Sequence, residues 1–211
     1  MGTVSEPSYR KRIGYHAGLL WAMAAICSAA LVIGYKATFN DIQLRQREDM
    51  QASLQQVIPA QLYDNDILAD KLDIPVDRKM MAGMEVIHVY RASKKNILTA
   101  FAYQVSGPGY AGPIAVMLGV DATGKILGTR VISHSETPGL GDKIEIKRDN
   151  WIESFTGLSL GAPPVDQWKV KKDGGDFDQF TGATITPRAV IKAVKQGLEF
   201  FQRHKNELLH I

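Results

Sequence analysis

The longest apolar run of the chain lies near its N-terminus. From Ile13 to Tyr35 there are 23 residues without Lys, Arg, Asp or Glu. At about 1.5 Å per residue a helix of this length spans roughly 34 Å, and a hydrocarbon core is about 30 Å thick. The pattern therefore predicts a transmembrane anchor over residues 13–35.

The charges that flank this run bear on its orientation. Arg10, Lys11 and Arg12 precede it directly and Lys36 follows it, although Arg45 and Arg47 even the count in a wider window. Basic residues favour the cytoplasmic side, so residues 1–12 are expected to form a cytoplasmic stub. A cleaved signal peptide is the alternative, but its apolar core is about 7–15 residues and ends in a small-x-small site. No clear site of that kind follows Tyr35.

The remaining chain is expected to form a stalk and one domain. Residues 36–58 are rich in Gln and Arg and contain no Gly or Pro, so they predict a juxtamembrane helix. Residues 59–211 are long enough for one domain of ordinary size. The net charge is only +3, and no Lys/Arg run is longer than Arg10–Arg12. Nothing in this pattern indicates nucleic-acid binding.

From Met84 the apolar positions recur with period two. Residues 86–90 and 97–105 predict one strand pair, and residues 114–120 and 126–132 predict a second. Residues 106–112 are too rich in Gly and Pro for anything but a loop. Residues 142–155 predict a helix and residues 167–171 a further strand. Hairpins with helices set apart indicate an α+β domain of antiparallel strands and helices.

The last element is a helix expected from about Pro187 to His204, because its apolar residues follow helical spacing. Thr186 is the expected N-cap and Pro187 the expected first helical residue. Free N–H groups at such a helix start favour anions, phosphate above all. The preceding Thr181-Gly182-Ala183-Thr184 is by its local chemistry either a capped turn or a phosphate-bearing loop.

A family resemblance separates these two interpretations. The segment Asp178-x-x-Thr181-Gly182-Ala183-Thr184 matches every position of the flavinylation motif, in which the last Thr is joined to FMN through a phosphoester by a dedicated transferase. With the surrounding residues 171–177 and 186–190, it is similar to the G subunit of the Rnf-type electron transport complex. The resemblance covers roughly Glu85 to Gln202 and includes the N-terminal anchor. It implies covalent FMN on Thr184, with Asp178, Thr181, Gly182 and Ala183 in the cofactor site.

The role of Asp178 within this motif stays open. Its carboxylate either helps the transferase to bind the acceptor loop or caps the turn. Thr181 and Thr186 also carry hydroxyls, so the choice of Thr184 rests on the resemblance alone.

A second loop, residues 134–143, contains Pro138, Gly139 and Gly141. On its own it is either a strand-to-helix connection or a rigid turn that exposes backbone N–H groups to a flavin. Its Glu-Thr-Pro-Gly-Leu-Gly sequence resembles the other signature of the same family. The resemblance implies that four residues lie beside the flavin: Glu136, Thr137, Leu140 and Gly141.

Other chemistry finds little support in the sequence. His134 and Glu136 would share a face of a strand, but two residues do not make a metal site, so none is expected. There is no dinucleotide-binding Gly-x-Gly-x-x-G after a strand and no Cys cluster for iron–sulfur, since Cys27 is the only cysteine. A protein that moves electrons without an NAD site or iron–sulfur ligands of its own must receive them from a partner and pass them on. No catalytic side chain is expected beyond the flavin carrier.

The resemblance then implies a bacterial inner-membrane protein with a cytoplasmic N-terminus and a periplasmic domain. It would relay electrons through FMN, among the other subunits of a complex that couples ferredoxin and NAD chemistry to ion movement, with no complete activity of its own. Two alternatives remain. One is the C subunit of the sodium-pumping NADH:quinone reductase, which shares the flavinylated domain. The other is an anchored sensor or assembly module, with or without flavin.

Overall fold

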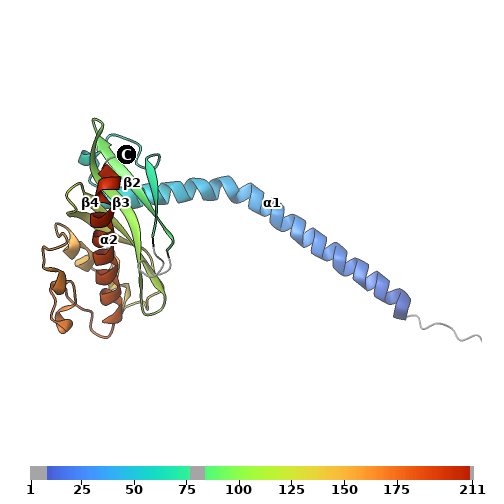
Figure 1. Cartoon of the computed structure of the whole chain (residues 1–211). Helices are drawn as coiled ribbons and strands as arrows, with labels where there is room; N and C mark the ends of the chain where they lie inside the picture. Colours follow the sequence, from blue (N-terminus) through green and yellow to red (C-terminus); the bar gives the residue numbers. More distant parts are fainter. Residues whose placement is uncertain (1–8, 77–83, 210–211) are drawn as a thin grey trace, which may run out of the picture. The chain divides into compact units, whose positions relative to one another are not determined.

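The computed structural model describes residues 9–76 and 84–209 and divides into two compact units, residues 1–49 and 50–211. Helix α1 (Tyr9–Val57) covers both the predicted anchor and the predicted stalk (Figure 1). The large apolar side chains of its predicted anchor segment are exposed, among them Leu20, Trp21 and Leu31. It is the one helix in the described residues long and apolar enough to cross a membrane, with a mean hydropathy of 2.1 in its most apolar window. An apolar surface of this extent is suited to lipid.

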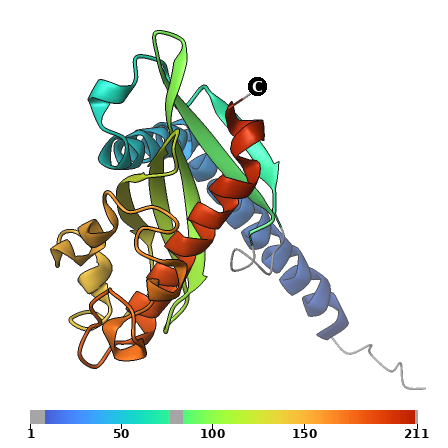
Figure 2. The same cartoon turned by 60° about the vertical axis from the view of Figure 1, so that its left-hand side comes forward.

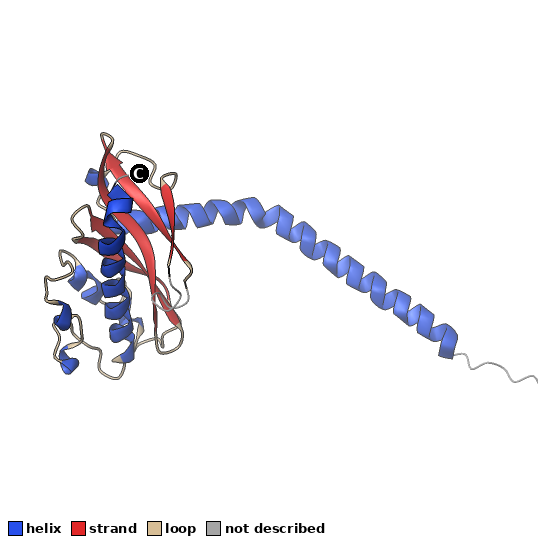
Figure 3. Ribbon diagram, in the orientation of Figure 1, coloured by secondary structure: helices blue, strands red, loops and turns tan. Residues whose placement is uncertain are grey.

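The second unit is built on a five-stranded antiparallel sheet (Figure 3). Its strands follow one another in space in chain order: β1 (Lys71–Pro75), β2 (Val86–Lys94), β3 (Ile97–Pro108), β4 (Pro113–Asp121) and β5 (Ile126–Ser133). Both predicted hairpins are confirmed, and β1 was not predicted. The β2–β3 turn places Lys95 and Asn96 at φ of 52° and 61°, the backbone that a two-residue type I′ turn requires.

One face of the sheet is covered by helix α2 (Ile185–Leu209), as Figure 2 shows. Phe101 and Tyr103 of β3 lie against Phe201 and Phe200 of the helix, with ring centroids 5.5 and 5.4 Å apart. The Tyr103 hydroxyl donates to the Gly197 carbonyl oxygen at 2.9 Å, and burial raises the pKa of that phenol. These contacts hold α2 along the sheet and so position its N-terminus.

The other face of the sheet is covered by the last turns of α1, within the second unit. Leu54 and Val57 are buried there with Ala100 and Ala102 of β3. The approach is close, because a Cβ added at Gly119 would overlap the Val57 carbonyl. The compact unit therefore begins at Met50, ahead of the predicted domain boundary at residue 59.

The helix predicted over residues 142–155 is wrong. The segment forms two short 3₁₀ helices, η2 (Asp142–Ile144) and η3 (Asn150–Phe155). The side chain of Asp149 accepts a hydrogen bond from the Trp151 N–H at 2.9 Å and caps η3. A side chain that competes in this way for backbone N–H groups interrupts a continuous helix.

The strand predicted over residues 167–171 is also wrong. That stretch contains the end of η4 (Val165–Gln167) and the start of η5 (Lys171–Asp173), and Val170 forms a single parallel bridge with Phe177. A further 3₁₀ turn, η1 (Ala60–Leu62), follows α1. The aromatic residues of segment 151–180 instead form a cluster in which ring contacts link Trp151, Phe155, Trp168, Phe177 and Phe180.

Candidate functional site

Two tight turns form the upper walls of a pocket beside the start of α2. In the first, the Leu140 N–H donates to the Thr137 carbonyl at 3.1 Å, with Gly139 at φ 79°. In the second, the Ala183 N–H donates to the Phe180 carbonyl at 3.1 Å, with Gly182 at φ 81°. A positive φ at the third residue is the mark of a type II turn and favours glycine. The two signature loops thus share one backbone geometry.

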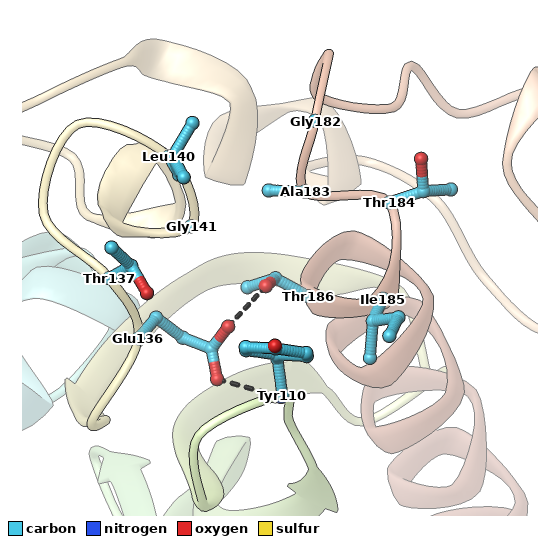
Figure 4. Close-up of a pocket in the computed structure, with 10 residues that line it drawn as sticks. All are labelled: Tyr110, Glu136, Thr137, Leu140, Gly141, Gly182, Ala183, Thr184, Ile185 and Thr186. Carbon is cyan, nitrogen blue, oxygen red and sulfur yellow. Dashed lines mark hydrogen bonds between the residues drawn. The ribbon is translucent and has the colours of Figure 1, made fainter.

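The pocket between these turns has a volume of about 320 Å³, which is within the range of small-molecule sites. Figure 4 shows how three segments surround it. Its ten lining residues are Tyr110, Glu136, Thr137, Leu140, Gly141, Gly182, Ala183, Thr184, Ile185 and Thr186. The structure therefore brings seven of the nine residues expected in the cofactor site around one cavity.

The rim of the pocket is apolar and exposed. The side chains of Tyr110, Leu140 and Ile185 are 71%, 45% and 48% exposed. Large apolar side chains that gather in this way around a cavity are typical of a surface that a ligand covers. Sequence reasoning missed Tyr110 and Ile185 as site residues and assigned Thr186 only as the helix cap. An aromatic residue within the Gly- and Pro-rich stretch 106–112, whose first three residues belong to β3, was the signal available for Tyr110.

The floor of the pocket is formed by the buried carboxylate of Glu136. Its Oε1 atom accepts hydrogen bonds from the backbone N–H groups of Tyr110, at 2.8 Å, and Ala111, at 3.1 Å. Its Oε2 atom accepts a hydrogen bond from the Thr186 hydroxyl. All three hydrogen bonds link Glu136 to other segments of the protein. Its side chain therefore joins the segments that surround the pocket and also faces the cavity.

The helix start differs from the prediction. Helix α2 begins at Ile185, and the Arg188 N–H donates to the Thr184 carbonyl at 3.4 Å. Thr184, not Thr186, therefore occupies the N-cap position, and Pro187 lies within the first turn. The Thr186 hydroxyl bonds Glu136 and does not cap the helix. Figure 4 shows the Thr184 side chain at the rim, directed away from this hydrogen bond.

Asp178 and Thr181 lie outside this pocket. They line a neighbouring hollow of about 610 Å³ together with residues of η3. The Asp178 carboxylate is exposed and accepts a hydrogen bond from the Lys171 ammonium at 2.6 Å. The structure therefore shows Asp178 in an ion pair. Among the described residues, its carboxylate does not cap the 180–183 turn.

A second ion pair lies at the N-terminal end of α2. Arg188 donates two hydrogen bonds to the Asp173 carboxylate, both of 2.6 Å. These hydrogen bonds hold the pKa of Asp173 below its ordinary value, and the charge of Arg188 acts in the same direction. Segment 171–173 is thus tied to the first turns of the helix through Asp173 and to the 178–184 loop through Lys171.

Two expectations for the 134–143 loop need correction. The Leu140 and Gly141 N–H groups both donate to the Thr137 carbonyl, so the turn does not expose them to a ligand. His134 and Glu136 do not share a strand face, because β5 ends at Ser133. The Glu136 N–H donates to His134 Nδ1 at 3.0 Å, and His134 Nε2 lies 2.7 Å from Glu145 Oε1.

Comparison with known proteins accords with this geometry. Residues 109–199, which contain the whole pocket, match the FMN-binding domain family. The G subunit of an ion-translocating oxidoreductase complex from Stutzerimonas stutzeri is 49% identical over 196 residues, covering 93% of this chain and 84% of the relative. The corresponding G subunit from Cereibacter sphaeroides strain ATCC 17029 is 49% identical over 193 residues, and that from Vibrio cholerae strain M66-2 is 42% identical over 193 residues. They cover 91% and 90% of this chain, and 86% and 91% of the relatives.

The fold and the pocket thus define a membrane-anchored protein with an FMN-binding domain. Within that class, the chain belongs to the family of G subunits of ion-translocating oxidoreductase complexes. Among solved structures, the C subunit of the Na⁺-translocating NADH-quinone reductase from Parabacteroides distasonis covers 67% of this chain and 71% of its own. At 22% identity and a TM-score of 0.44 it carries no argument about function.

Proposed function

We propose that this chain is the membrane-anchored flavoprotein component of an ion-translocating oxidoreductase complex of the Rnf type, carrying one FMN covalently on Thr184. The family match and the pocket around Thr184 support this function. FMN supplies one- and two-electron redox chemistry when bound. The other subunits provide its electron donor and acceptor, and the complex couples ferredoxin and NAD chemistry to ion movement.

The residues of the pocket fit the two halves of FMN. The exposed rim of Tyr110, Leu140 and Ile185 matches a flat and largely apolar ring. The N–H groups of Ile185 and Thr186 precede the first helical hydrogen bond of α2, so they complement a phosphate at Thr184.

The covalent bond would be formed by a separate transferase. The Thr184 Oγ1 atom attacks the flavin-side phosphorus of a flavin dinucleotide donor. The new O–P bond replaces the phosphoanhydride bond of the donor, a nucleoside monophosphate leaves, and the hydroxyl proton is released. Intact-mass measurement of the full-length protein produced with its transferase tests this step. The expected gain is one FMN less one water, together with flavin fluorescence that survives denaturation. An unchanged mass would contradict the covalent link.

Asp178 is expected to serve the transferase, because its exposed carboxylate does not hold the acceptor turn. We predict that Asp178→Asn lowers the yield of covalent flavin by at least about tenfold, the effect of roughly 1.4 kcal/mol in recognition. Lys171→Gln is the matched control, since it breaks the same ion pair from the other side. The two yields are measured by intact mass. An equal loss of yield in both variants would mean that flavin attachment requires the ion pair and not the Asp178 carboxylate by itself.

The domain is expected on the periplasmic side of the bacterial inner membrane. In a Cys27→Ala background, a membrane-impermeant maleimide added to spheroplasts should label Gln202→Cys, an exposed position of α2. It should not label Ser5→Cys unless the membrane is first permeabilised. The opposite labelling pattern would reverse the proposed orientation.

A further inference from the structure

The pocket contains one charged side chain. Of the ten residues that line it in the described part of the chain, Glu136 alone bears a carboxylate or a basic group, and it is only 5% exposed. Burying a carboxylate is costly unless hydrogen bonds compensate it. A buried charge at the floor of a cofactor pocket therefore needs a structural or electrostatic reason.

The contacts of Glu136 join all three walls of the pocket. Tyr110 and Ala111 belong to the loop after β3, Glu136 to the loop after β5, and Thr186 to the first turn of α2. These segments are far apart in the sequence. A single carboxylate with three donors is thus the group through which they meet (Figure 4).

Two glycines enclose the carboxylate closely. A Cβ added at Gly109 would lie 2.5 Å from Glu136 Oε1. One added at Gly141 would lie 2.9 Å from both Glu136 Oε2 and the Thr186 hydroxyl oxygen. Real Cβ atoms do not approach other atoms so closely, so each loop must carry glycine for the carboxylate to take this place.

The backbone of Glu136 is held as well. Its N–H donates to His134 Nδ1, so that nitrogen carries no proton in this arrangement and Nε2 donates to Glu145. The carboxylate is therefore fixed both by its own hydrogen bonds and by the loop that presents it.

We propose that Glu136 is the positioning residue of this pocket and that its negative charge lowers the reduction potential of the flavin bound there. The proposal rests on the proposed flavin function. Three donors satisfy the ionised carboxylate, which accepts hydrogen bonds only. Reduction adds negative charge to the flavin, and a fixed carboxylate in a site shielded from water opposes it more strongly than one in solvent.

The Glu136→Gln variant removes the negative charge of the side chain but keeps its shape and its place in the pocket. The Gln carbonyl still accepts from Tyr110 and Ala111, and its amide group donates to the Thr186 hydroxyl oxygen. In the flavin-loaded full-length protein we expect a midpoint potential shifted upward. Glu199→Gln removes the same charge roughly 20 Å along α2 and should leave the potential unchanged. Equal potentials in Glu136→Gln and the parent, or an equal shift in Glu199→Gln, would overturn the electrostatic role.

Glu136→Ala tests position without flavin. In the flavin-free full-length protein, the Tyr110 and Ala111 amides should exchange with solvent much faster in Glu136→Ala than in the parent or Glu136→Gln. Equal protection in all three would overturn the positioning role. A parent protein that takes up no flavin would refute the proposed function and the effect on potential together. Amide exchange decides the positioning role in either case.

Discussion

Replacing Thr184 by valine is expected to abolish covalent flavin while the domain stays folded. Valine keeps the branched shape of threonine but lacks the hydroxyl that would bear the phosphoester. Thr184 lies at the rim of the pocket, and its side chain points away from the buried Glu136–Thr186 hydrogen bond (Figure 4). We therefore expect no FMN mass increment and no fluorescent band on a denaturing gel. Because Thr184 occupies the N-cap position, the free energy of unfolding should fall by about 1 kcal/mol at most.

Two variants make this result specific. Thr184→Ser restores a hydroxyl at the same position and should recover flavin attachment at least in part. Thr181→Val removes the exposed hydroxyl of the 180–183 turn, which lines the neighbouring hollow. Covalent flavin that persisted in Thr184→Val and disappeared in Thr181→Val would show that the bond is on Thr181 instead.

Among the variants considered for this domain, replacing Phe155 by alanine is expected to lower the free energy of unfolding the most. Phe155 is fully buried, and its ring lies 4.8 Å from that of Phe177 and 5.3 Å from that of Trp151. Truncation of such a phenylalanine costs about 3–5 kcal/mol, because a cavity remains. A domain is commonly stable by only about 5–15 kcal/mol. Denaturant titration followed by tryptophan fluorescence measures the change.

The same variant should also reduce flavin attachment. Trp151 connects the aromatic cluster to the acceptor loop, because its ring contacts Phe180 and its Nε1–H donates to the Asp178 carbonyl at 2.9 Å. Phe155→Leu leaves a smaller cavity and serves as the graded control. A loss below about 1 kcal/mol in Phe155→Ala would show that the cluster does not support this segment.

The elements that the sequence predicted well are those with a strong local signal. β2 alternates buried and exposed residues, β3 and β4 are mostly apolar runs buried on both faces, and turn residues separate the strands, so local pattern was enough to find β2 to β5. The apolar helix at the N-terminus and α2 are long and regular. Their existence was predicted correctly, although α2 starts two residues before and ends five residues after the predicted bounds.

The incorrect predictions fall where tertiary contacts override local pattern. Residues 142–155 were predicted as one helix, but Asp149 caps a separate turn and Trp151 and Phe155 turn into the aromatic cluster. Val170 has strand propensity but joins the core with a single bridge. Thr186 has the chemistry of a cap, yet Glu136, 50 residues away in the chain, takes its hydroxyl.

The sequence by itself determined the apolar anchor helix, the strand pairs of the α+β domain, and the motif that nominates Thr184, because each is encoded within a short run of residues. Only the tertiary structure decided that the two signature loops and Tyr110 surround one pocket, that Asp178 lies outside it, and that Glu136 joins its walls. Those relations depend on residues far apart in the chain that meet when α2 packs on the sheet. No pattern within a short run of residues predicts these long-range contacts.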